Sequence, residues 1–162
     1  MFEHAREAFM KTFKKILCAV DLSEDLPDAA EYTAWLAKKL DAEVIVLNVT
    51  PNAAHFSGFI ISPDYTKDFV AQLESGAQKA MDEFLPKYFA GVKTRGLVLQ
   101  GDPAEEIMAC ADEEKVDVII MTSHGRKGLD RLLLGSVVQK VAKYAAQPLL
   151  TVQPQSDSQP GK

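Results

Sequence analysis

Cysteine is scarce in this chain: Cys18 and Cys110 are the only two among 162 residues. Both lie in apolar stretches, and their spacing matches no metal-ligand pattern, so a zinc site of clustered cysteine and histidine is excluded. Two isolated thiols of this kind predict buried, reduced cysteines, which are typical of a cytoplasmic protein.

Long hydrophobic runs and an excess of positive charge are missing as well. No apolar run approaches the roughly 20 residues that a membrane helix needs, and the N-terminus lacks the hydrophobic centre of a secretory signal. The formal net charge of −5 argues against non-specific attraction to nucleic acid or to an anionic membrane. We therefore expect a cytoplasmic protein with neither nucleic acid nor a membrane as a partner.

Three common catalytic motifs are absent. The chain has no G-x-x-x-x-G-K-[ST] phosphate loop and no G-x-G-x-x-G after its first apolar run. It also lacks the G-x-S-x-G elbow of serine hydrolases. The sequence therefore lacks the motifs that standard nucleotide hydrolysis, dinucleotide redox chemistry and triad hydrolysis require.

What the sequence does contain is a regular alternation of apolar runs and helical patterns. The pattern predicts strands at residues 16–20, 44–49, 94–99, 116–121 and 148–152, and helices at 27–40, 65–89 and 103–115 with a last one from Ser136. Asp102 is the predicted N-cap of the third helix, with Pro103 in its first position. This rhythm predicts an α/β fold in three layers, with one parallel sheet covered on both faces by helices.

The two ends of the chain are expected to lie outside this single domain of residues 13–153. Phe2, Ala5, Phe9 and Phe13 recur at helical spacing, which predicts an N-terminal amphipathic helix over 1–12 that docks on the domain itself or on a partner. The polar tail, 154–162, contains proline and glycine and is expected to be disordered. In the long helix at 65–89, the spacing predicts an inner face of Phe69, Leu73, Ala77, Ala80 and Phe84.

Parallel sheets of this kind bind ligands beyond the carboxyl ends of their strands. Topology therefore brings Asp21, at the end of the first strand, close to the glycine loop that follows Met121. Asp21 either caps a turn or contacts a ribose hydroxyl or a metal ion. Gly125 is a turn glycine or part of a phosphate site, and Arg126 is a solvated charge or a phosphate contact.

The last helix begins with a second small pair, Gly135 and Ser136. Ser136 is followed three residues later by Gln139, the spacing of a capping box, so Ser136 is the predicted N-cap. Its hydroxyl, together with the backbone N–H groups of Val137 and Val138, is also placed to face a phosphate. The two interpretations are compatible.

Taken together, these segments resemble the universal stress protein family, and the resemblance covers roughly residues 13–153. It implies a sheet of order 3-2-1-4-5 and a homodimer formed through the last strand, Leu149, Leu150, Thr151 and Val152. The segments that carry it are 14–21 (KKILCAVD), 43–49 (EVIVLNV), 101–106 (GDPAEE), 116–125 (VDVIIMTSHG), 132–141 (LLLGSVVQKV) and 147–152 (QPLLTV).

Nucleotide-binding members of that family carry the motif G-x2-G-x9-G-[ST]. Gly125 and Gly135-Ser136 match its second half, but its first glycine falls on Thr122. Threonine either crowds the ribose and phosphates or offers a hydroxyl in place of the close backbone approach that glycine allows. Glycine is not required there if the backbone has negative φ, so we expect nucleotide binding to be retained.

The resemblance also implies the contacts. Ala19, Val20 and Asp21 line the adenosine side, the Val49 backbone meets the adenine edge, and Met121 and Thr122 end the neighbouring strand. Gly125, Gly135, Ser136, Val137 and Val138 hold the phosphates, with Arg126 added on its charge alone. The implied ligand is ATP or AMP, with Mg²⁺ or Mn²⁺ beside a triphosphate and Asp21 as the metal contact.

Two functions follow from this pattern. The first is a dimeric regulatory protein of the stress response that binds ATP or AMP, signals through an unknown protein partner and hydrolyses little or no nucleotide. Phosphoryl transfer needs several metal ligands and a group that orients the nucleophile, and only Asp21 is a credible metal contact. The second is a nucleotide-free interaction protein, and a weak ATPase ranks third.

Overall fold

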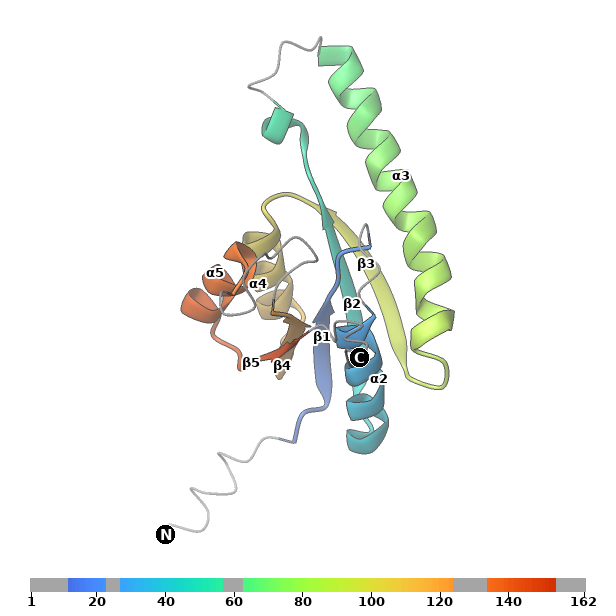
Figure 1. Cartoon of the computed structure of the whole chain (residues 1–162), viewed down its shortest axis with the longest axis vertical. Coiled ribbons are helices and arrows are strands. Elements are labelled where there is room, and N and C mark those ends of the chain that lie inside the picture. The colour runs from blue at the N-terminus through green and yellow to red at the C-terminus, as the bar shows by residue number, and fades with distance from the viewer. Residues whose placement is uncertain (1–11, 23–26, 57–62, 124–133, 154–162) are drawn as a thin grey trace, which may run out of the picture.

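Five strands form one parallel sheet in the order β3-β2-β1-β4-β5, the order that the resemblance implied (Figure 1). The computed structural model describes residues 12–22, 27–56, 63–123 and 134–153. Neighbouring strands pair in parallel throughout. The strands are β1 (Lys15–Ala19), β2 (Glu43–Thr50), β3 (Thr94–Gln100), β4 (Val118–Thr122) and β5 (Leu149–Val152).

Helices cover both faces of this sheet, so the predicted three-layer α/β fold is confirmed. The three central strands, β1, β2 and β4, are mostly apolar on both sides because both of their faces are buried. The helical elements are α2 (Asp28–Leu40), η1 (Ala53–Phe56), α3 (Pro63–Tyr88), α4 (Pro103–Glu113) and α5 (Ser136–Tyr144).

Side chains that alternate along each strand divide the core into two clusters. Leu17 of β1 and Ile119 of β4 pack with residues of α4 and α5. Their neighbours Ile16 and Ile120 pack with residues of α2 and α3 on the other face. The two crossovers before β3 therefore lie on one side of the sheet and the two after it on the other.

Both cysteines are buried, as the sequence predicted. Burial raises the pKa of the Cys18 thiol to about 12, and the Thr33 hydroxyl, which donates to Cys18 Sγ at 3.4 Å, opposes this shift. Burial also raises the pKa of Cys110. Both groups therefore stay protonated thiols at neutral pH.

The predicted start of α4 is confirmed in detail. Asp102 Oδ1 accepts hydrogen bonds from the backbone N–H groups of Ala104 and Glu105, both at 3.1 Å. Pro103 follows as the first helical residue. This cap holds the end of β3 and the start of α4 at the carboxyl edge of the sheet.

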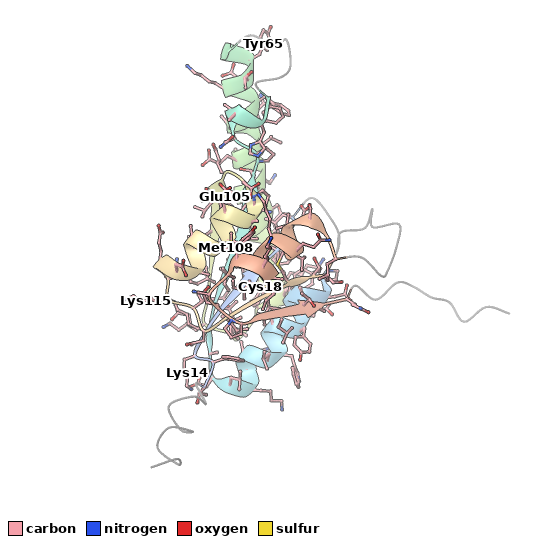
Figure 2. The ribbon with its side chains drawn as sticks, turned by 90° about the vertical axis from the view of Figure 1, so that its left-hand side faces the viewer. Lys14, Cys18, Tyr65, Glu105, Met108 and Lys115 are labelled. Carbon is pink, nitrogen blue, oxygen red and sulfur yellow. The ribbon has the colours of Figure 1, made fainter. Side chains whose placement is uncertain are left out.

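The inner face of α3 differs from the prediction. Phe69 is 47% exposed and packs edge-to-face against Phe56, whereas Met81, which was not predicted to be buried, is fully buried. The first part of α3 extends beyond the sheet, and Tyr65 lies far out along it (Figure 2). Helical spacing alone does not reveal where the sheet beneath a helix ends.

Several predictions concern residues outside the described ranges. They are the N-terminal helix up to residue 11, the tail from 154, and the loop 124–133 with Gly125 and Arg126. None of the helices in the described ranges is both long enough and apolar enough to span a bilayer.

Candidate functional site

A cavity of about 780 Å³ opens at the carboxyl end of the sheet. The ends of β1, β2 and β4 form its floor, and α3, η1 and the starts of α4 and α5 form its walls. The sheet order changes direction between β1 and β4, and ligands of open α/β sheets bind at such a point. The cavity therefore lies where the fold favours a ligand site.

Ten of the twelve residues predicted for a nucleotide site line this cavity. The remaining two, Gly125 and Arg126, lie outside the described residues. The ten are Ala19, Val20, Asp21, Val49, Met121, Thr122, Gly135, Ser136, Val137 and Val138.

Backbone and amide hydrogen bonds fix the end of β1 in the cavity floor. The Val20 N–H donates to Leu47 O at 2.9 Å, and Asn48 Nδ2 donates to Val20 O at 3.0 Å. Asn48 is buried and itself lines the cavity. Its signal in the sequence is one amide within the apolar run of β2, and Asn48 was not among the predicted site residues.

The end of β4 and the start of α5 are joined directly, although ten residues separate Ser123 from Leu134. The Ser123 N–H donates to Val152 O, and Ser123 O accepts from the Gly135 N–H, both at 2.9 Å. These bonds fix the start of α5 beside the end of β4. The first motif position, Thr122, is thus placed close in space to the Gly135-Ser136 pair.

Thr122 is the last residue of β4 and is paired with Val152 in register. Asp41 and Lys115 are the only non-glycine residues with positive φ within the described ranges, so the Thr122 backbone does not need glycine. Met121 belongs to the cluster that contains α5 residues, whereas Ile120 belongs to the opposite one. Strand alternation therefore directs the Thr122 side chain to the α2 face, away from the start of α5.

The predicted capping box at Ser136 is wrong. Gly135 is the N-cap, with φ −60° and ψ 154°, and Ser136 is the first helical residue. Within the described ranges, no side chain caps α5, and Gln139 Nε2 donates instead to Leu134 O at 2.7 Å. A serine inside the first turn has helical backbone angles. They direct its hydroxyl away from the N–H groups that donate to an N-cap side chain.

With Gly135 as its N-cap, the start of α5 offers backbone N–H groups to an anion. The N–H groups of Ser136, Val137 and Val138 belong to the first turn and have no partner in the helix ladder. All three residues line the cavity. Uncapped N–H groups and the positive end of the helix dipole favour a phosphate at this point.

The described lining contains little formal charge. Asp21 is its one carboxylate, and it includes no lysine or arginine. No group of three or more His, Cys, Asp or Glu residues that could hold a metal occurs in the part of the chain that the structure describes. A metal ion at Asp21 would therefore need oxygen ligands from a bound phosphate, the arrangement in which proteins usually hold Mg²⁺.

The wall of the cavity formed by η1 and α3 was not predicted from the sequence. His55 of η1 and Gln72, Leu73, Gly76 and Ala77 of α3 line the cavity. The His55 ring lies 2.8 Å from Asn52 Oδ1. A Cβ at Gly76 would meet no atom within 4 Å, so this small residue leaves the cavity wide.

Comparison with known proteins identifies the relatives of this chain. The model described as the universal stress protein family matches residues 12–153. Universal stress protein MJ0531 of Methanocaldococcus jannaschii is 35% identical over 144 residues, which are 86% of this chain and 82% of that protein.

Solved structures agree with this result. The structure of the hypothetical protein MJ0577 of Methanocaldococcus jannaschii is 29% identical, with a TM-score of 0.77, and the match covers 91% of this chain and 100% of that one. A family member from Arabidopsis thaliana with AMP bound shares 21% identity and a TM-score of 0.62, over 91% of this chain and 95% of that one. At that identity, the second likeness shows the fold.

Proposed function

The chain belongs to the universal stress protein family, and from this premise we propose that it binds ATP or AMP in the cavity at the carboxyl end of its sheet. The observation that carries the proposal is the start of α5, which no described side chain caps and which faces the same cavity as the ends of β1, β2 and β4. A family member that binds AMP supports the choice of an adenine nucleotide.

In this proposal the ligand lies across the floor of the cavity. The phosphates meet the N–H groups of Ser136, Val137 and Val138, and the Val49 backbone meets the edge of the adenine. Ala19, Val20 and Asp21 line the adenosine side, as the family pattern implies. The apolar α3 wall, with Leu73 and Ala77, covers a base without adding charge.

Thr122 is compatible with this placement. The main objection to nucleotide binding is the loss of the first motif glycine. The Thr122 side chain lies on the face of the sheet opposite the start of α5, and its backbone does not occupy the positive-φ region. The close approach of a phosphate to α5 is therefore not blocked by a threonine at this position.

We propose a regulatory role with little or no hydrolysis. Phosphoryl transfer requires metal ions held by several ligands and a group that positions the attacking water. Among the described lining residues, Asp21 is the one acid that could contact Mg²⁺ or Mn²⁺. A bound nucleotide would instead act as a signal that is read by a protein partner of a homodimer.

The dimer is proposed to form through the edge strand β5. The Ile119 N–H donates to Pro148 O and the Ser123 N–H to Val152 O, so alternate residues of β5 face β4. The backbone groups of Leu149 and Thr151 then point to the other edge, where the described residues place no further strand. Such an edge pairs readily with a second copy.

Mass spectrometry of the protein purified without added nucleotide tests this function. Under native conditions we expect one adenine nucleotide per chain, and denaturing conditions should release ATP or AMP and reveal its identity. Absence of a nucleotide, together with no thermal shift in millimolar AMP or ATP–Mg²⁺, would contradict the proposal. That result would favour the nucleotide-free interaction protein.

A further inference from the structure

The outer face of α2 carries a pair of exposed aromatic side chains that lie outside the core. Tyr32 and Trp35 are 40% and 53% exposed, and their ring centroids lie 5.6 Å apart. The opposite face of the same helix is buried through Ala30, Ala34 and Ala37. Aromatic side chains exposed together on a helix, away from its core face, are suited to an apolar partner.

The chain enters the domain at the C-terminal end of this helix. Phe13 packs with the cluster on the α2 side of the sheet. Lys14 Nζ donates to Leu40 O at 3.1 Å, and Lys14 lies at the base of the molecule (Figure 2). The described part of the chain therefore begins beside the last turn of α2.

The segment of residues 1–11 is long enough to reach the aromatic pair. Trp35 lies five positions before Leu40, which corresponds to about 7.5 Å along a helix. Eleven residues in helical form would span about 16 Å. A helix over residues 1–11 that turned back along α2 would therefore pass both aromatic rings.

The chemistry of this segment matches the surface. Its apolar residues Phe2, Ala5 and Phe9 share one helical face, and Glu7 lies outside that face near the end of the segment. The last turn of α2 carries Lys38 and Lys39. The match to the family model begins at residue 12, so residues 1–11 lie outside that match.

We propose that residues 1–11 dock in the same chain on the outer face of α2. Phe2 and Phe9 would cover the Tyr32–Trp35 pair, and Glu7 would lie near Lys38 and Lys39. The segment would thus shield an aromatic surface that the family domain alone leaves open. This inference is independent of nucleotide binding.

Trp35 is the sole tryptophan, so its fluorescence reports directly on this surface. We expect the double substitution Phe2→Ser and Phe9→Ser in the full chain to raise acrylamide quenching, because a docked helix in contact with Trp35 would keep the quencher away from its ring. Met10→Ser, an apolar residue beside the proposed face, is the matched control and should leave quenching unchanged. Equal quenching in the double variant and the natural chain would overturn the proposal.

Charge reversal separates docking from a general loss of structure. Glu7→Lys should also expose Trp35, and adding Lys38→Glu with Lys39→Glu should restore its protection. Failure of this rescue would count against the predicted charge pairing. Protection that is lost on dilution together with the dimer would assign the surface to a second copy and contradict docking within one chain.

Discussion

Thr122 stands where the nucleotide-binding motif of the family has its first glycine, and its surroundings decide what that change means. Its backbone is extended, it pairs with Val152, and its side chain is directed away from the start of α5. Glycine would therefore remove a side chain that does not face the phosphate site.

We accordingly expect Thr122→Gly to change AMP affinity by less than about tenfold, equivalent to about 1.4 kcal/mol. Isothermal titration calorimetry of the two proteins measures the difference directly. A much larger gain in affinity in the glycine variant would mean that Thr122 crowds the ligand after all. Thr122→Ser, which keeps the hydroxyl, shows whether the methyl group or the hydroxyl is responsible.

Ser136 offers a sharper test at the residue scale because it is the first residue of α5. Proline is well tolerated at this helical position but lacks an N–H. Hydrogen bonds to charged groups contribute about 1.5–3 kcal/mol, so Ser136→Pro should weaken AMP binding about tenfold to a hundredfold.

The controls for this substitution use the ligand as well as the protein. Adenosine has no phosphate, so its binding should differ little between Ser136→Pro and the natural chain. Ser136→Ala keeps the N–H and isolates the contribution of the hydroxyl. A parallel loss of adenosine and AMP binding would show that the proline had disturbed the cavity rather than a phosphate contact.

Among the elements, β5 carries the proposed dimer interface. The Thr151 N–H points to the open edge, so Thr151→Pro should remove an edge donor while sparing the bonds to β4. We expect this variant to sediment as a monomer at micromolar concentration and the Thr151→Ala control to sediment as a dimer. A dimeric proline variant with an unchanged sedimentation coefficient would exclude this strand as the interface.

The elements themselves were largely predictable, because their signals are local. Continuous apolar runs predicted the strands of a sheet that is buried on both faces, and Asp102 with Pro103 predicted the start of α4. The face of α3 was not fully predictable: Phe69 and Met81 share a helix, but their burial depends on where the sheet ends below it. The position at which the sheet ends below α3 is a property of the tertiary structure.

The site followed from the sequence only in part, for similar reasons. The ends of the strands were placed by topology, and the family pattern supplied their contacts. The α3 wall was missed because the position of Gly76 beside the strand ends depends on how α3 packs over the cavity. At Ser136 the local spacing was misleading: Gly135 is the cap although it has no side chain to offer.

At the scale of the whole molecule, carboxylates join elements at the base of the sheet. Glu114 Oε2 lies 2.9 Å from Lys15 Nζ and 2.5 Å from Arg95 Nη2, which links the end of α4 to β1 and β3. The hydrogen bond from Arg95, followed by that from Lys15, lowers the pKa of Glu114 below its ordinary value of 4.5. The folded protein therefore favours the ionised carboxylate more than the unfolded chain does.

A lowered pKa determines the direction of the pH dependence. The contribution of Glu114 to stability is fully present above pH 4.5 and is lost as the pH falls through the lowered pKa of the folded state. Glu114→Gln should therefore reduce Tm slightly at pH 7, and the difference from the natural protein should shrink below pH 4.5. Thermal melts across this range, with Glu113→Gln as the control, test this; a difference that grows in acid would contradict the assignment.

The central claim is that the cavity between the strand ends and α5 binds an adenine nucleotide through its phosphates. Calorimetric titration of nucleotide-free protein with AMP, and with ATP in the presence of Mg²⁺, tests it most directly. The structure predicts saturable binding of one nucleotide per chain that is weakened by Ser136→Pro. Absence of binding up to millimolar nucleotide, in a protein shown to be folded by its thermal transition, would contradict the claim.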